Sequence, residues 1–184
     1  VDADQWVRTA KAAGMKLIVF TAKHHDGYCL WQTRYNENFS VKQSPWQNGS
    51  GDVMRELADA CRKHGVKLGF YLSPADLYQI ENKDGLYGNR SVARESLIPT
   101  NPETFRTDPA QGRTPPAGMP AFNYKVDDYN RYMLNQLYEL LTEYGPIDEV
   151  WFDGAHPKPK GDQRYDEGAW FGMIRKLAPR ATIF

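Results

Sequence analysis

Apolar residues recur along the chain with two alternating kinds of spacing. In residues 2–13, 52–65, 126–144 and 166–177 they return every three to four positions, which is the spacing of an amphipathic helix. Between these segments lie short continuous apolar runs that predict strands, at residues 16–21, 67–72, the middle of 147–155, and 181–184. Because helix and strand alternate and the strands are continuously apolar, the pattern is typical of a parallel sheet buried on both faces.

The connections between these elements differ in length on the two sides of the predicted sheet. Helices pass into strands through very short turns, at Gly14-Met15, Gly65-Val66 and Gly145-Pro146, whereas strands pass into helices through long loops rich in His, Asp, Trp and Pro. This asymmetry is expected of a (β/α)8 barrel, whose chemistry lies at the carboxyl ends of its strands. A doubly wound open sheet is the alternative, but no predicted strand is followed by a Gly-rich phosphate loop. The expected fold class is therefore α/β, a partial (β/α)8-type (TIM-like) barrel with about four parallel strands.

Residues 75–125 interrupt the alternation. They are rich in Pro, Gly, Asn and Thr and show little periodicity, so we expect a long loop insertion of the kind that is usually functional or mobile. The chain starts close to a helix and ends within an apolar strand-like run. We therefore expect residues 1–184 to be the central part of a single catalytic barrel domain, truncated at both ends.

Composition excludes several classes of partner. The 184 residues contain 23 Lys and Arg against 23 Asp and Glu, so no net charge favours nucleic acid or an anionic membrane surface. No apolar run is long enough to span a bilayer. Aromatic residues are abundant, with 11 Tyr and 5 Trp, and many fall in the predicted loops. Aromatic side chains on loops suit stacking against sugar rings or bases, or packing beneath the loops.

Polar candidates gather at the predicted carboxyl ends of three strands. His24 and His25 follow the first strand, Tyr71 ends the second, and Trp151 and Asp153 end the third. Since side chains alternate along a strand, Trp151 and Asp153 are expected to point the same way. A carboxylate there is either a turn former or a functional group, because burying a charge is costly unless it is used.

Three kinds of chemistry fit such a rim to different degrees. A metal-dependent hydrolase would need ligands such as His24, His25 and Asp153, but adjacent histidines at a strand end point to opposite sides. Ser or Cys nucleophilic catalysis lacks its characteristic turn motif. Glycoside hydrolysis needs two carboxyl groups together with neutral donors and aromatic rings for the sugar. The candidates supply all of these except the second carboxyl, and no cofactor or metal is expected.

Four ordered motifs occur in these loops and strand ends: Lys23-His24-His25-Asp26-Gly27-Tyr28-Cys29-Leu30-Trp31, Ser44-Pro45-Trp46, Gly69-Phe70-Tyr71-Leu72-Ser73-Pro74 and Glu149-Val150-Trp151-Phe152-Asp153-Gly154-Ala155. Together they resemble the α-L-fucosidases of glycoside hydrolase family 29. The residues of the first two motifs are most similar to the branch of α-1,3/1,4-fucosidases.

The resemblance implies a barrel enzyme that removes terminal α-L-fucose with retention, through a covalent glycosyl-enzyme. Matched by motif, Asp153 corresponds to the nucleophile, His24 and His25 to paired sugar-binding histidines, and Tyr71 and Trp151 to aromatic residues of the fucose pocket. The implied partner is a fucosylated oligosaccharide or glycoconjugate. The family's acid/base Glu lies some forty residues beyond the nucleophile, and only 31 residues follow Asp153 (184 − 153), so this residue is not expected in the chain.

We therefore expect the 184 residues alone to be inactive. A non-catalytic fucose-binding relative that kept the pocket and lost the acid is the alternative from a different functional class. The resemblance is compatible with an extracellular, periplasmic or lysosomal location, and the sequence leaves localisation, linkage preference and oligomeric state open.

Overall fold

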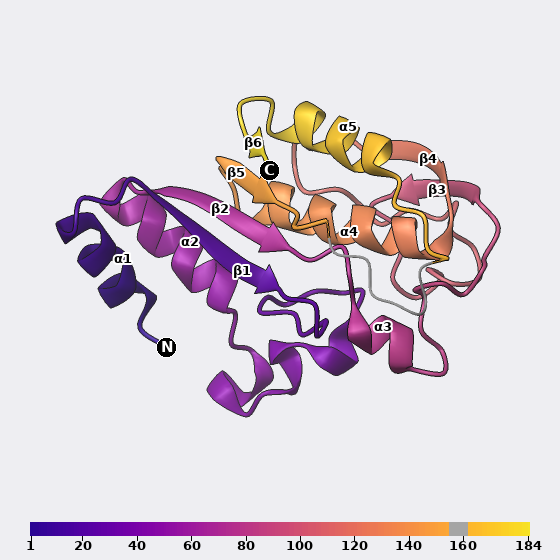
Figure 1. Ribbon diagram of the computed structural model, residues 1–184, viewed down its shortest axis with the longest axis horizontal. Coiled ribbons are helices and arrows are strands. Elements are labelled where there is room, and N and C mark those ends of the chain that lie inside the picture. Colours follow the sequence, from indigo (N-terminus) through magenta and orange to yellow (C-terminus); the bar gives the residue numbers. More distant parts are fainter. Residues whose placement is uncertain (155–161) are drawn as a thin grey trace.

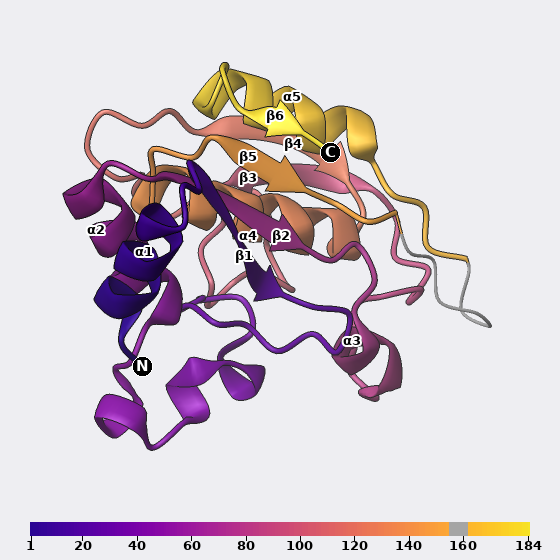
Figure 2. The same ribbon diagram turned by 60° about the vertical axis from the view of Figure 1, so that its left-hand side comes forward.

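The core of the protein is a four-stranded parallel sheet (Figure 1). The structure, a computed structural model, describes residues 1–154 and 162–184. The strands lie in the order β1–β2–β5–β6, and Figure 2 shows them fanned in that order, with β6 at the top. Their bounds are Leu17–Lys23 for β1, Lys67–Leu72 for β2, Glu149–Trp151 for β5 and Thr182–Ile183 for β6. The expected α/β class with four parallel strands is confirmed. The Pro- and Lys-rich segment 155–161, which includes the last residue of the fourth motif, lies outside the described residues.

Four helices accompany the sheet, each begun by an aspartate. The side chains of Asp2, Asp52, Asp127 and Asp166 accept a backbone N–H bond from the first turn of α1, α2, α4 and α5, respectively. Such a cap satisfies one of the amide groups that the helix leaves unpaired at its start. The helices span Ala3–Ala12 (α1), Val53–His64 (α2), Asp128–Glu143 (α4) and Glu167–Leu177 (α5), close to the expected segments. Helix α2 ends at Gly65, whose φ of 67° is the left-handed conformation that glycine adopts readily.

The register of the strands divides the sheet into a covered face and an open one. Phe20 pairs with Phe70 and Phe70 with Val150, and the latter two are fully buried. One residue further along, Tyr71 pairs with Trp151, and Trp151 is 36% exposed. The expectation of a sheet buried on both faces was therefore wrong for the face that carries Tyr71 and Trp151, because no described element covers it.

The segment 75–125 is more structured than the sequence indicates. It contains the short helix α3 (Leu77–Glu81) and two strands, β3 (Arg94–Ile98) and β4 (Phe122–Val126), which pair in antiparallel fashion. Three short 3-10 turns, Glu37–Phe39, Val41–Gln43 and Trp46–Gly49, shape the other long loop, which follows β1. Figure 1 shows the arrowheads of β1 and β2 directed toward the side of the molecule where α3 lies.

The β3–β4 hairpin covers α4. Thr100, just after β3, donates its backbone N–H to the side chain of Asn135 at 2.8 Å, and the Tyr138 hydroxyl donates to the carbonyl of Pro120 at 2.9 Å. As a result α4 is buried nearly all round, including its polar residues Asn130, Arg131, Asn135, Gln136 and Glu139. The insertion is thus a packed layer over this helix.

Candidate active site

The loop that carries the two histidines is fastened to the segment after β2. The backbone N–H of Ser73 donates to the carbonyl of Lys23 at 3.0 Å, and that of Leu77 donates to the carbonyl of His25 at 2.7 Å. These bonds fix the backbone on both sides of His24, while the two imidazoles remain exposed. A rigid backbone with exposed side chains suits ligand binding, since little order has to be gained on binding.

Four of the five predicted site residues contact one another. The rings of His24 and His25 lie 4.1 Å apart, and the ring of His24 stacks on that of Tyr71 at 5.5 Å with an interplanar angle of 25°. The Tyr71 hydroxyl donates a hydrogen bond to Oδ2 of Asp153. The cluster therefore joins the carboxyl ends of β1, β2 and β5.

Trp151 lies beside this cluster on the open face of the sheet. It pairs with Tyr71 in the β2–β5 register, and its ring packs against Phe184 at 4.6 Å. Phe152 points to the other side and packs against Trp170 and Phe171, as the alternation of a strand requires. One expectation needs correction: β5 ends at Trp151, so Asp153 lies in the following loop and is not the last strand residue.

The contact between Tyr71 and Asp153 changes the acidity of the phenol. Burial and the hydrogen bond to the Asp153 carboxylate together raise the pKa of Tyr71 to about 12. Tyr71 is therefore protonated at neutral pH and acts as a hydrogen-bond donor. A neutral donor held against a carboxylate orients that carboxylate without removing its charge.

A buried ion pair beneath the histidines is not evident from the sequence. Lys23 and Asp76 are both fully buried, and their Nζ and Oδ2 atoms lie 3.1 Å apart. The Tyr132 hydroxyl donates to the same oxygen at 3.1 Å, and the ammonium lies 4.8 Å from the Tyr132 ring centre. Lys23 stands at the head of the first motif, and a lysine at the end of an apolar strand is the one signal that could have indicated a buried partner.

Gly27 allows the histidine loop to approach this pair. A Cβ added at this position would lie 2.2 Å from Oδ1 of Asp76, and the residue has a φ of +93°. A side chain at Gly27 would therefore be strained and would also displace the carboxylate that neutralises Lys23.

The site contains no evident metal centre. Among residues 1–154 and 162–184, no group of three or more His, Cys, Asp and Glu side chains lies close enough to hold a metal ion. Within the same part of the chain, no helix combines the length and hydrophobicity needed to cross a membrane.

A four-stranded parallel sheet with its polar and aromatic cluster at the carboxyl ends of the strands is consistent with part of a β/α barrel, a class of protein whose chemistry lies at that rim. A protein-family model described as Alpha-L-fucosidase matches residues 1–184, and the chain belongs to this family.

Individual relatives support the same family. The chain is 38% identical over 184 residues to alpha-L-fucosidase 1 of Arabidopsis thaliana, covering 100% of this chain and 28% of that protein. Its fold is similar to the crystal structure of a glycoside hydrolase 29 family member from a rumen bacterium, at 40% identity and a TM-score of 0.65, over 100% of this chain and 27% of that one. It is also similar to the GH29 fucosidase of Ruminococcus gnavus in complex with fucose, at 31% identity and a TM-score of 0.66, over 96% of this chain and 31% of that one. The chain thus spans little more than a quarter of the length of such relatives.

Proposed function

We propose that the protein carrying this chain is a retaining exo-glycosidase that releases terminal α-L-fucose from fucosylated oligosaccharides or glycoconjugates. The observation that carries the proposal is the cluster of Asp153, Tyr71 and His24 on the barrel rim of a chain that belongs to the alpha-L-fucosidase family. Relatives are named as fucosidases, and the Ruminococcus gnavus relative holds fucose.

In this proposal Asp153 is the nucleophile. One oxygen of its carboxylate attacks the anomeric carbon of fucose, forming a carbon–oxygen bond as the glycosidic bond breaks. The departing oxygen of the remaining glycan takes a proton from an acid. Water then attacks the same carbon from the side opposite Asp153 and gives a proton to the conjugate base of that acid. The bond between the carbon and Asp153 breaks, which releases the carboxylate and α-L-fucose with its original configuration.

The other members of the cluster hold the sugar and the carboxylate. Tyr71 donates to Oδ2 of Asp153 and so orients the carboxylate for attack on the sugar. The imidazoles of His24 and His25 can each donate to and accept from ring hydroxyls. The half-exposed ring of Trp151 offers a flat apolar surface for the methyl group and apolar edge of fucose.

The general acid is assigned to a Glu outside these 184 residues. Glu95 of the 75–125 segment is a poor substitute, since it lies on β3 opposite Lys125, in the hairpin that covers α4. A retaining glycosidase needs its two carboxyl groups about 5–5.5 Å apart. The proposal therefore requires a second carboxyl brought to Asp153 by another strand-end loop.

Replacement of Asp153 tests the assignment directly. In the complete protein, Asp153→Asn should lower kcat/KM on aryl α-L-fucoside and on fucosylated oligosaccharides by about 10³-fold or more. The matched control is Asp59→Asn, which alters an exposed carboxylate on α2 that pairs with Arg62. In Asp153→Gly, added azide should restore turnover and give β-L-fucosyl azide, because azide occupies the space of the missing carboxylate.

The result also separates the alternatives. Wild-type-like turnover by Asp153→Asn would contradict the assignment, and fucose binding without turnover by the wild type would identify a non-catalytic fucose-binding relative. We further propose that the protein belongs to the α-1,3/1,4-fucosidase branch, because the residues of its motifs at 23–31 and 44–46 resemble that branch. Faster hydrolysis of α-1,3- and α-1,4-linked fucose than of α-1,2-linked fucose would support this, and the reverse order would contradict it.

A further inference from the structure

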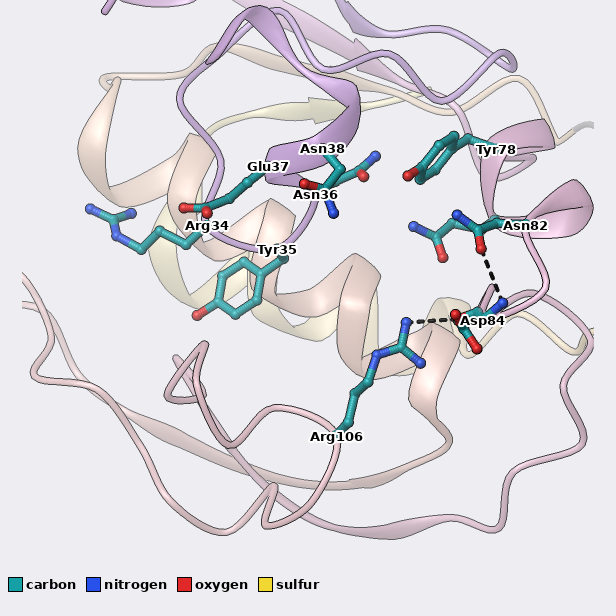
Figure 3. Close-up of a pocket in the computed structure, with 10 residues that line it drawn as sticks. Arg34, Tyr35, Asn36, Glu37, Asn38, Tyr78, Asn82, Asp84 and Arg106 are labelled. Atoms are coloured by element: carbon teal, nitrogen blue, oxygen red, sulfur yellow. Dashed lines mark hydrogen bonds between the residues drawn. The ribbon is translucent and has the colours of Figure 1, made fainter. Parts of the chain in front are cut away.

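A pocket lies on the same rim, apart from the histidine cluster. Figure 3 shows this pocket, which has a volume of about 330 Å³ and includes none of the five candidate site residues in its lining. Its walls come from the loop after β1, from α3 and the turn after it, and from one arginine of the insertion. The lining residues used below are Asn38, Tyr78, Asn82, Asp84 and Arg106.

One wall of the pocket is fastened to the loop that carries the histidines. The backbone N–H of Tyr78 donates to the carbonyl of Asp26 at 3.2 Å, next to the bond from Leu77 to His25. The ring of Tyr78 also stacks on Phe39 at 4.5 Å with an interplanar angle of 7°. Tyr78 is therefore held in place from two sides, and the pocket is anchored to the residues that flank the candidate active site.

The pocket presents polar groups that are open to a ligand. Figure 3 shows the Tyr78 hydroxyl directed toward the space beside Asn36 and Asn38. Within the described parts of the chain, neither the Asn38 carboxamide nor the Tyr78 hydroxyl forms a hydrogen bond. The side-chain oxygen of Asn82 accepts from the backbone of Asp84 at 3.0 Å, which leaves its NH₂ group to donate elsewhere. Carboxamides and a phenol each supply a donor and an acceptor.

The charges around the pocket are balanced. Glu37 pairs with Lys42, and Arg34 is engaged by Glu139 and Glu143. The guanidinium of Arg106 donates to the carbonyl of Asp84 at 2.7 Å, beside the Asp84 carboxylate. With no excess of either sign, the pocket does not select an anion such as phosphate or a cation. A neutral ligand with many hydroxyl groups matches its donors and acceptors.

We propose that this pocket binds one neutral sugar unit, as a second saccharide site beside the fucose site. At about 30 Å³ per water its volume equals that of about eleven water molecules, and it falls at the lower end of the ~300–1,000 Å³ typical of ligand sites. The sugar has two possible sources: the substrate's own glycan beyond the fucose, or a separate glycan chain. The first source rests on the function proposed above, and the second does not.

Kinetics of the complete protein with two substrates test the first source. The double variant Asn38→Ala/Tyr78→Phe removes two hydrogen-bonding groups and keeps the Tyr78 ring on Phe39. Its kcat/KM on a fucosylated oligosaccharide should fall about 10-fold, since two hydrogen bonds of about 0.7 kcal/mol each amount to that factor. Its kcat/KM on an aryl α-L-fucoside, which has no second sugar, should stay within twofold. Asn38→Trp, which fills the pocket, should have the same selective effect.

A binding measurement tests the second source and separates the two proposals. N-acetyllactosamine, a neutral disaccharide without fucose, should bind the wild type in saturation-transfer NMR and should not bind the double variant. The matched control is Asn123→Ala, an exposed asparagine on β4 outside the pocket, which should behave as wild type in both assays. Loss of disaccharide binding with unchanged oligosaccharide hydrolysis identifies a separate glycan as the occupant.

Two results would overturn the proposal. One is equal loss of activity on both substrates, which would mean that the variants disturb the histidine loop. The other is unchanged oligosaccharide hydrolysis together with unchanged or absent disaccharide binding. If the wild type hydrolyses no fucoside at all, the proposed function fails, and the disaccharide experiment still decides the pocket.

Discussion

At the scale of single residues, Asp76 holds three segments of the chain together. Its Oδ2 accepts from Lys23 at the end of β1 and from Tyr132 on α4, and its Oδ1 accepts the backbone N–H of Gln79, at 3.0 Å, in the first turn of α3. Lys23 directly precedes the exposed His24 and His25 in the chain. The position of His24 thus depends on a carboxylate 52 residues away in the sequence (76 − 24).

Neutralising Asp76 should destabilise the protein strongly. Asp76→Asn keeps an N-cap side chain for α3 but leaves the ammonium of Lys23 buried without a counter-charge. Breaking one side of a buried ion pair costs about 3–5 kcal/mol of unfolding free energy, which urea denaturation would measure. The matched control is Asp162→Asn, whose partner Arg90 is 83% exposed and where a change of about 0–1 kcal/mol is expected. A loss below 1 kcal/mol for Asp76→Asn would show that the pair is not needed.

Sequence reasoning reached the residues on the rim but not those that support them. The candidates on the rim could be predicted because each motif is contiguous in the sequence and the carboxyl ends of parallel strands in a barrel meet at one rim. These candidates are His24, His25, Tyr71, Trp151 and Asp153. Lys23 and Asp76 are 53 positions apart, and no periodicity indicates which buried charge faces which. The pocket lined by Asn38, Tyr78 and Asn82 was missed for the same reason, because these side chains come together only after the loops have folded.

At the scale of elements, the helices and strands were predicted correctly where a single spacing of apolar residues extends through the whole segment. The four main helices and the strands β1 and β2 were predicted close to their observed bounds. The hairpin β3–β4 was missed because 23 residues separate its strands, so no tight turn marks it. The alternation Phe122-Asn123-Tyr124-Lys125-Val126, with Val126 buried and Asn123 exposed, is the signal that could have indicated a strand there.

Helix α4 is the element that ties the rim loops to the body of the protein. Its Glu139 is fully buried and accepts from the indole N–H of Trp31 at 3.0 Å, and from the backbone and guanidinium of Arg34 at 3.0 and 3.1 Å. Burial raises the pKa of Glu139, while the bonds from Arg34 and Trp31 favour its charged form. The loop after β1 therefore depends on a carboxylate from a helix more than one hundred residues away.

Removal of this carboxylate should loosen the loop as well as lower stability. Glu139→Ala leaves the indole N–H of Trp31 without an acceptor and removes one of the two carboxylates that pair with Arg34, at a cost of about 1–3 kcal/mol in unfolding free energy. Hydrogen exchange should increase in residues 28–36 more than in α5. The control Glu95→Ala alters an exposed carboxylate on β3 and should change stability by no more than about 0.5 kcal/mol. Unchanged hydrogen exchange in residues 28–36 would show that Glu139 does not hold this loop in place.

At the scale of the whole molecule, the open face of the sheet determines what the chain can do alone. Parallel sheets normally have both faces covered. Here Tyr71, Trp151 and Asp153 lie on or beside a face that the described elements leave open, and Phe184 next to Trp151 is 69% exposed. An exposed aromatic surface of this kind binds hydrophobic dyes and is covered in a closed barrel.

The described residues of β5 and of the loop after it place no second carboxyl on this face at the distance that retention requires. Glu149 points to this face, but it precedes Asp153 by four residues, about 13 Å at ~3.3 Å per extended residue. That separation far exceeds the ~5–5.5 Å of a retaining pair. Asp153 can therefore act as a nucleophile only when another part of the protein brings an acid to the glycosidic oxygen.

We expect the 184-residue chain alone to show no turnover of aryl α-L-fucoside. A protein in which the chain is extended to the length of its relatives should be active, because the added strands close the open face and supply the acid. Steady-state assays measure the turnover, and anilinonaphthalene sulfonate fluorescence should be high for the short chain and low for the extended one. The Asp153→Asn form of each protein controls for contaminating fucosidase. Turnover by the short chain within tenfold of the extended protein would show that the acid lies within these 184 residues, and Asp26, next to the histidines, would be the first carboxylate to replace.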